Sequence, residues 1–205
     1  MDYVLYYWGI PFRGNFLLLM LEDVGASYEH RNSRELYPQR RLSVRHPGMA
    51  PPFLYERSTN AHFNQMPACL MHLARANDRL PGDAVGDTLA LKVILDCDDV
   101  LMEITRHNGM MMWERDAWMK FRTDRLATWM RIFEGVGRHH GLTPGAGFML
   151  GENVSVADLA TTALFGTMVH SFPQLAEDLE THLRELSDPM GLLAQDRARI
   201  IIKHC

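Results

Sequence analysis

The 205-residue sequence has few cysteines and no long apolar run. Its three cysteines, Cys69, Cys97 and Cys205, are widely spaced and form no Cys-x-x-Cys pair. This spacing argues against a disulfide framework, a zinc site and a dithiol redox motif. The longest apolar runs, such as residues 16–21, are too short to cross a bilayer. The first residues lack the pattern of a secretory signal, so we expect a cytoplasmic protein.

Neither positive nor negative charge is in large excess. The chain has 21 Lys and Arg against 25 Asp and Glu, and no segment is basic enough to follow a phosphate backbone. We therefore expect neither nucleic acid nor an anionic membrane as a partner. The ten histidines show no metal-ligand spacing, so no metal is expected. Fourteen methionines are compatible with gap filling in the core or with an adaptable apolar pocket.

The first 79 residues change their hydrophobic period often, which predicts a small α/β domain. Residues 3–8 form a β-branched and aromatic run of strand length. Further elements are expected as a helix over 16–24, strands over 26–30 and 53–55, a hairpin turn at 58–60 and a helix over 65–76. The order β-α-β-α-β-β-α, with a weakly helical stretch after residue 32, implies a small mixed sheet with helices packed on it.

Residues 80–83, with the sequence Leu-Pro-Gly-Asp, are the predicted linker. Beyond them strand patterns nearly vanish, and we expect a second domain over 86–205 that is an all-α helical bundle. Its predicted helices lie over 87–106, 112–138, 155–170, 174–185 and 190–202, with a glycine-rich loop at 141–151.

The end of the first strand leads through a glycine-proline loop into a helix that begins near Arg13 and Gly14. A helix N-terminus presents unpaired N–H groups and a partial positive charge, so it favours an anion. Tyr7, at the strand end, could direct its hydroxyl toward this point. The alternative is a half-buried strand tyrosine that hydrogen-bonds water.

A second motif, residues 50–53, precedes the predicted third strand. Pro51 is a candidate cis-proline, which would leave the backbone groups of Ala50 free to pair with an extended, peptide-like ligand. The alternative is an ordinary trans turn. A third motif is structural: Ser155 and Asp158 are spaced as a helix-capping box, flanked by Val154 and Leu159 as a hydrophobic staple.

In this order and at these separations, the three motifs resemble the glutathione transferase family, nearest its tyrosine-type mu, pi and alpha classes. The resemblance covers nearly the whole chain, with a thioredoxin-like domain over 1–79 and a helical domain over 86–205. It implies an enzyme that activates the glutathione thiol for attack on small hydrophobic electrophiles, a detoxification role and a homodimer. A glutathione transferase-like binding protein without catalysis, holding apolar ligands or a partner chain, remains the alternative.

The resemblance also implies roles for individual residues. Tyr7 is the expected donor to the glutathione sulfur, and Tyr6 is a weaker substitute because strand alternation directs it to the opposite face. The implied glutathione-binding residues are Trp8, Arg13, Arg41, Met49, Ala50, Pro51, Gln65 and Met66. Arg40 is an alternative to Arg41 for the glycyl carboxylate. The implied hydrophobic-substrate residues are Phe12, Met111 and Trp113, although the last two are equally compatible with packing between helices.

The sequence departs from the family pattern at three places. Met66 occupies the position of a serine that binds the γ-glutamyl group. The spacing from Tyr7 to Arg13 is two residues longer, and Pro47 falls where related dimers have an aromatic key residue. These departures favour the binding-protein alternative. An acidic cluster, Asp96, Asp98 and Asp99, resembles the place from which related dimers contact the partner's glutathione, or else forms a solvated helix face.

Overall fold

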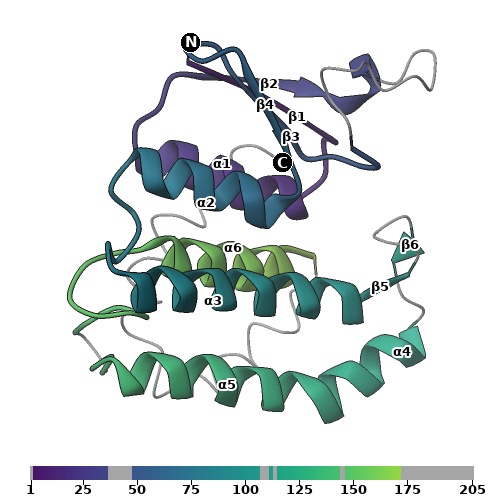
Figure 1. The fold of residues 1–205 in the computed structure, drawn as a ribbon. Helices are drawn as coiled ribbons and strands as arrows, with labels where there is room; N and C mark the ends of the chain where they lie inside the picture. Colours follow the sequence, from purple (N-terminus) through teal and green to yellow (C-terminus); the bar gives the residue numbers. More distant parts are fainter. Residues whose placement is uncertain (1, 37–47, 107–110, 113–114, 144–145, 172–205) are drawn as a thin grey trace.

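The computed structural model describes residues 2–36, 48–106, 111–112, 115–143 and 146–171 (Figure 1). Its first part is a four-stranded sheet of order β2-β1-β3-β4. The strands are β1 (Tyr3–Tyr7), β2 (Tyr28–Asn32), β3 (Phe53–Glu56) and β4 (Ala61–Asn64). β1 pairs with β2 in parallel and with β3 antiparallel, and β3 pairs antiparallel with β4. The predicted mixed sheet is therefore confirmed.

Two helices, α1 (Arg13–Asp23) and α2 (Met66–Ala76), lie on the face of the sheet that is turned toward the rest of the molecule (Figure 1). Every residue of α1 from Arg13 to Leu21 is buried. Because α1 is covered by the sheet on one side and by helices on the other, it is apolar around most of its circumference rather than amphipathic. β1 is an inner strand because it pairs with β2 on one side and β3 on the other, and it is largely buried.

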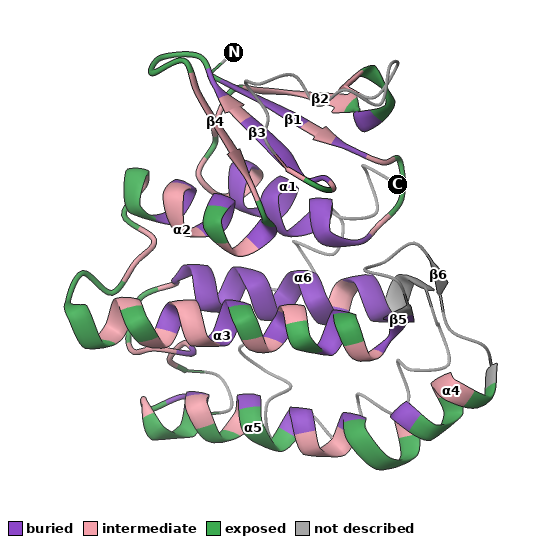
Figure 2. Ribbon diagram, turned by 45° about the vertical axis from the view of Figure 1, so that its right-hand side comes forward, coloured by how far each residue is buried: buried purple, intermediate pink, exposed green. Residues whose placement is uncertain are grey.

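The second part begins with α3 (Ala84–Glu103), whose start is set by Asp83. The Asp83 carboxylate accepts hydrogen bonds from the backbone N–H groups of Val85 and Gly86, both at 2.9 Å. The helices that follow are α4 (Arg115–Lys120), a π-helical turn (Phe121–Arg125), α5 (Leu126–His139) and α6 (Val156–Ser171). In Figure 2, α6 is buried along nearly all its length, as α1 is, whereas α5 alternates between buried and exposed residues.

The expectation of one helix over 112–138 was wrong at its start. Met111–Met112 forms a short strand, β6, which pairs antiparallel with β5 (Thr105–Arg106) directly after α3. A strand of two residues has no hydrophobic period, so the sequence pattern extended the following helix over it. The expected helices at 174–185 and 190–202 lie outside the described residues.

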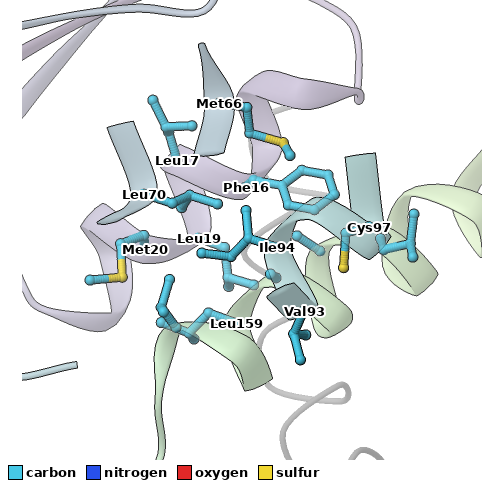
Figure 3. Close-up of a cluster of buried hydrophobic side chains, with 14 of the residues drawn as sticks. Phe16, Leu17, Leu19, Met20, Met66, Leu70, Val93, Ile94, Cys97 and Leu159 are labelled. Carbon is cyan, nitrogen blue, oxygen red and sulfur yellow. The ribbon is translucent and has the colours of Figure 1, made fainter. Parts of the chain in front are cut away.

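One core joins the two parts of the chain (Figure 3). It contains side chains from four helices, among them Phe16, Leu19, Met20, Met66, Leu70, Val93, Ile94, Cys97 and Leu159. An ion pair between Arg79, before α3, and Asp23, at the end of α1, adds a contact of 2.7 Å at the edge of this core. α1 is therefore held along its length by contacts with both parts of the chain.

One half of the predicted capping box at α6 is confirmed: Asp158 accepts from the Ser155 N–H, whereas the Ser155 hydroxyl donates to that carboxylate instead of capping a backbone N–H. The Asp158 carboxylate accepts hydrogen bonds from the backbone N–H of Ser155 at 2.9 Å and from the Ser155 hydroxyl at 2.8 Å. Its other oxygen accepts the N–H of Met149 at 2.7 Å. Burial raises the pKa of Asp158 above its ordinary value, and these hydrogen bonds oppose that shift. Asp158 thus ties the preceding loop to the first turn of α6.

Candidate functional site

Tyr7, the last residue of β1, lies against the first turn of α1. A Cβ atom added to Gly14 would stand 2.2 Å from Cδ1 of Tyr7, so only glycine allows the ring to approach the helix this closely. The side chain is only 3% exposed. Burial raises the pKa of the Tyr7 phenol well above its ordinary value, while the charge of Arg13 and the backbone N–H groups of Gly14 and Arg13 oppose the shift. The phenol oxygen therefore faces the N-terminal end of α1 and stays protonated at neutral pH.

Tyr6 lies on the other face of the sheet. It is paired in register with Arg31 of β2 and Phe53 of β3. This placement follows from strand alternation. Of the two adjacent tyrosines, Tyr7 is the one that meets α1.

Arg13, the first residue of α1, is bound between the two parts of the chain. Its Nε atom lies 2.8 Å from Oδ1 of Asp98 on α3, and its Nη2 atom lies 3.2 Å from the sulfur of Met102. Its guanidinium carbon also lies 5.0 Å from the centre of the Phe12 ring. Asp98 is therefore an ion-pair partner rather than part of a solvated face. Phe12 is itself buried in the core, beside the start of α1.

The cis peptide bond before β3 joins Pro51 to Pro52. The prediction that Pro51 is the cis residue was therefore wrong by one position, because two adjacent prolines offered two candidates and the sequence pattern did not distinguish them. Both prolines are buried, Ala50 is partly buried, and Met49 is strongly exposed. Since proline has no backbone N–H, Pro51 and Pro52 offer only carbonyl groups to a ligand.

Gln65 precedes α2 in an unusual conformation, with a φ of +67°. Its side chain is exposed and makes no capping hydrogen bond to the helix. Met66 points into the core, and Pro67, at the helix start, has no N–H. The N–H groups of Met66 and Ala68 are left as the first donors of α2, which favour a carboxylate at this point.

The structure also places two other residues that the family resemblance implies, Trp8 and Met111. Trp8 is partly buried and packs against the core. Met111 has its backbone in β6, while Arg40, Arg41, Pro47 and Trp113 lie outside the described residues.

Within the described part of the chain, no group of three or more His, Cys, Asp or Glu side chains could hold a metal ion. No helix found in that part is long and apolar enough to span a membrane.

One buried polar residue in the first turn of α1 was not predicted from the sequence. Asn15, in the first turn of α1, is 3% exposed, and its amide nitrogen has no hydrogen-bond partner among the described residues. Its only sequence signal is that a polar residue directly precedes the apolar run from Phe16 to Leu21. Buried amides are normally hydrogen-bonded, so this donor needs an explanation.

A mixed four-stranded sheet with two helices on one face, followed by a helical layer, defines the class of proteins that join a thioredoxin-like domain to an all-helical domain. The family model of the glutathione S-transferase C-terminal domain matches residues 89–195, more than half of the chain. The protein therefore belongs to the glutathione S-transferase family. No curated protein matches the sequence.

Three solved structures share the fold. A Pi-class glutathione S-transferase of Onchocerca volvulus is 18% identical, with a TM-score of 0.71 over 100% of this chain and 92% of its own. Prostaglandin synthase D of Nilaparvata lugens is 15% identical, with a TM-score of 0.72 over 99% and 98%. NaGST-2 is also 15% identical, with a TM-score of 0.69 over 91% of both chains. At these identities the likeness extends to the fold alone.

Proposed function

We propose that this protein is an enzyme that activates the thiol of glutathione for attack on small hydrophobic electrophiles. The observation that supports this most is the position of the Tyr7 phenol at the N-terminal end of α1. A cysteine thiol ionises near pH 8.5, and only the thiolate is a good nucleophile. A protonated phenol that donates a hydrogen bond to the sulfur favours the thiolate, and each unit of lowered pKa corresponds to about 1.36 kcal/mol.

Other residues near Tyr7 suit some of the groups of the glutathione tripeptide. Gln65 and the first N–H groups of α2 suit the γ-glutamyl carboxylate, and the orphan amide of Asn15 lies in the same turn that Tyr7 meets. Arg41 is the candidate for the glycyl carboxylate. The electrophile would lie against Trp8, Phe12, Met111 and Trp113, whose apolar side chains accommodate ligands of mixed shape.

A turnover assay tests this function. With glutathione and a chloronitrobenzene, we expect Tyr7→Phe to lower kcat/KM by about tenfold or more, because the lost hydrogen bond to a charged sulfur is worth about 1.5–3 kcal/mol. Tyr6→Phe is the matched control and should leave the activity unchanged, since Tyr6 lies on the other face of the sheet. Equal activity in the parent and Tyr7→Phe would show that Tyr7 does not activate the thiol.

The second candidate is a binding protein for apolar ligands or a partner chain. Two observations favour it: Met66 is buried where the family has a serine, and Pro51 and Pro52 remove two backbone donors beside the site. Calorimetric titration with glutathione separates the two functions. Binding at millimolar glutathione or below supports the enzyme, and no detectable heat there supports the binding protein.

The remaining family features are proposals of the same kind. We expect a homodimer in the cytoplasm that acts in detoxification, with neither nucleic acid nor a membrane as partner. The net charge of −4 is consistent with this set of partners. Sedimentation equilibrium tests the dimer: a single species of the 23.5 kDa monomer mass would contradict it.

A further inference from the structure

Glu103, the last residue of α3, accepts three hydrogen bonds from side chains that follow α4 in the chain. Arg125 donates through Nε to Oε2 at 3.0 Å and through Nη2 to Oε1 at 2.6 Å. The indole Nε1 of Trp129 donates to Oε1 at 3.0 Å. The bonds from Arg125, and after them the bond from Trp129, lower the pKa of Glu103 below its ordinary value against the effect of burial. A charged carboxylate therefore connects the end of α3 to the start of α5.

A carboxylate is the wrong charge for the end of a helix. The C-terminus of a helix carries a partial negative charge, so Lys or Arg is favoured there and Glu is disfavoured. The last turn of α3 contains no basic residue of its own, and Arg125 supplies the missing positive charge from another element. The stability of α3 alone does not explain Glu103. Residues that break a local rule in this way often have a functional reason.

The backbone around Arg125 directs the two donors toward Glu103. Residues Phe121–Arg125 form a π-helical turn, a rare feature that occurs often at functional sites. Arg125 and Trp129 are four positions apart and so lie on one face of the helix. The Trp129 ring lies 6.2 Å from that of Phe133, which meets Phe165 of α6 edge-on at 5.8 Å. The donors are therefore fixed to the core of the helical part.

The last turn of α3 contacts the candidate site on its other side. The Met102 sulfur lies 3.2 Å from Nη2 of Arg13, and Asp98, one turn earlier, pairs with Nε of the same residue. Directly after α3 the chain enters β5, where the Thr105 hydroxyl donates to the carbonyl of Leu101 at 2.8 Å (Figure 1). This turn therefore lies between the start of α1 and the β5–β6 hairpin.

Glu103 and Arg125 are 22 positions apart, and the chain between them forms β5, β6 and α4. Their contact closes the base of this segment. We propose that Glu103 is a positioning residue for the electrophile: its bonds to Arg125 and Trp129 fix the β5–β6 hairpin relative to the turn of α1 beneath Tyr7. This inference rests on the proposed function, in which Met111 of β6 lies against the electrophile.

The experiment replaces Glu103 by glutamine, which keeps the shape and an acceptor for Trp129 but removes the charge. With glutathione and a chloronitrobenzene, we expect kcat/KM for the electrophile to fall by about tenfold, through a higher KM, because small displacements of positioning groups cost up to about 100-fold. The Kd of glutathione, measured by calorimetry, should not change, since its proposed binding residues lie in the first part of the chain. Arg125→Gln should have the same effect, and the double variant should add nothing, because the two residues form one contact.

Glu134→Gln is the matched control. Glu134 pairs with Arg138 within α5, and the side chains of that pair are 21% and 54% exposed, close to the 27% and 53% of Glu103 and Arg125. We expect Glu134→Gln to keep the parent KM for the electrophile. A Glu103→Gln protein with a lower Tm and a lower kcat but the parent KM would show that the contact is only structural, and would overturn the inference.

The proposed function can fail separately. If Tyr7→Phe lowers kcat/KM but Glu103→Gln leaves the KM for the electrophile unchanged, thiol activation stands and the role of Glu103 falls. If the parent protein does not convert the chloronitrobenzene with glutathione, both fall.

Discussion

Arg13 at the start of α1 and Asp98 on α3 form an ion pair with 2.8 Å between Nε and Oδ1. Arg13 is nearly buried, whereas the Asp98 side chain is 29% exposed. The pair connects the turn beneath Tyr7 to the helical part of the chain. It therefore couples the geometry of the candidate site to the packing between the two parts.

We expect Asp98→Asn to lower the free energy of unfolding by about 1–3 kcal/mol. This loss is smaller than for a fully buried pair because solvent reaches Asp98. It remains measurable because the substitution leaves the Arg13 guanidinium without its counter-charge. Denaturant unfolding measures this loss. Asp96→Asn is the control: Asp96 pairs with a partly exposed Lys92 within the same helix, and such pairs contribute only about 0.3–0.5 kcal/mol. Equal losses in the two variants would contradict the connecting role.

Gly14→Ala should displace Tyr7. The added Cβ would stand 2.2 Å from Cδ1 of the ring, and relieving such overpacking costs about 1–3 kcal/mol. We expect a lower Tm together with loss of the glutathione-dependent activity. Gly135→Ala on α5 is the matched control, because its new Cβ meets nothing within 4 Å. Gly135→Ala should be neutral or up to about 1 kcal/mol more stable. A Gly14→Ala protein with the same stability as Gly135→Ala would contradict the close contact between Gly14 and the Tyr7 ring.

The cap of α6 predicts unequal effects for its two residues. Ser155→Ala removes one hydroxyl, and we expect a loss of about 0.5–2 kcal/mol. Asp158→Ala leaves the buried N–H groups of Met149 and Ser155 without acceptors. Each unsatisfied N–H costs about 1–3 kcal/mol, so we expect Asp158→Ala to lower the free energy of unfolding clearly more than Ser155→Ala does. Thermal unfolding of the two variants decides the order. The reverse order would show that the hydroxyl, rather than the carboxylate, anchors the helix start.

Glu56, at the end of β3, predicts a pH-dependent stability. The Thr59 hydroxyl, followed by His72 and Tyr3, lowers the pKa of Glu56 below its unfolded value of 4.5. The stabilisation from the carboxylate is therefore fully present above about pH 4.5 and is lost as the pH falls through the lower folded pKa. We expect the difference in unfolding free energy between the parent and Glu56→Gln to shrink below pH 4.5. A difference that is constant down to pH 3 would contradict this.

Most of the fold could be predicted from the sequence, because long periodic segments and turn residues determine it. The order of the four strands with α1 and α2, and the bond from the Ser155 N–H to the Asp158 carboxylate, were confirmed. Of the weakly helical stretch predicted after residue 32, Ser33–Leu36 forms a 3₁₀ turn, and residues 37–47 lie outside the described part of the chain. The hairpin of β5 and β6 was missed because strands of two residues have no period. The cis bond was assigned to the wrong proline because local sequence does not distinguish Pro51 from Pro52.

The site was less predictable than the fold. Tyr7 was expected at the start of α1, but the ion pair of Arg13 with Asp98 joins residues 85 positions apart. Such a contact depends on how α1 packs against α3, which no local pattern encodes. Asn15 was missed for the same reason, since its unpaired amide becomes visible only when burial is known.

The most direct measurement is the pKa of the glutathione thiol in the complex, followed by the ultraviolet absorbance of the thiolate as the pH is raised. In the parent protein we expect this pKa to lie at least about one unit below the ordinary value of 8.5, and Tyr7→Phe should return it toward that value. A thiol that ionises at the same pH in the parent and in Tyr7→Phe would contradict the account.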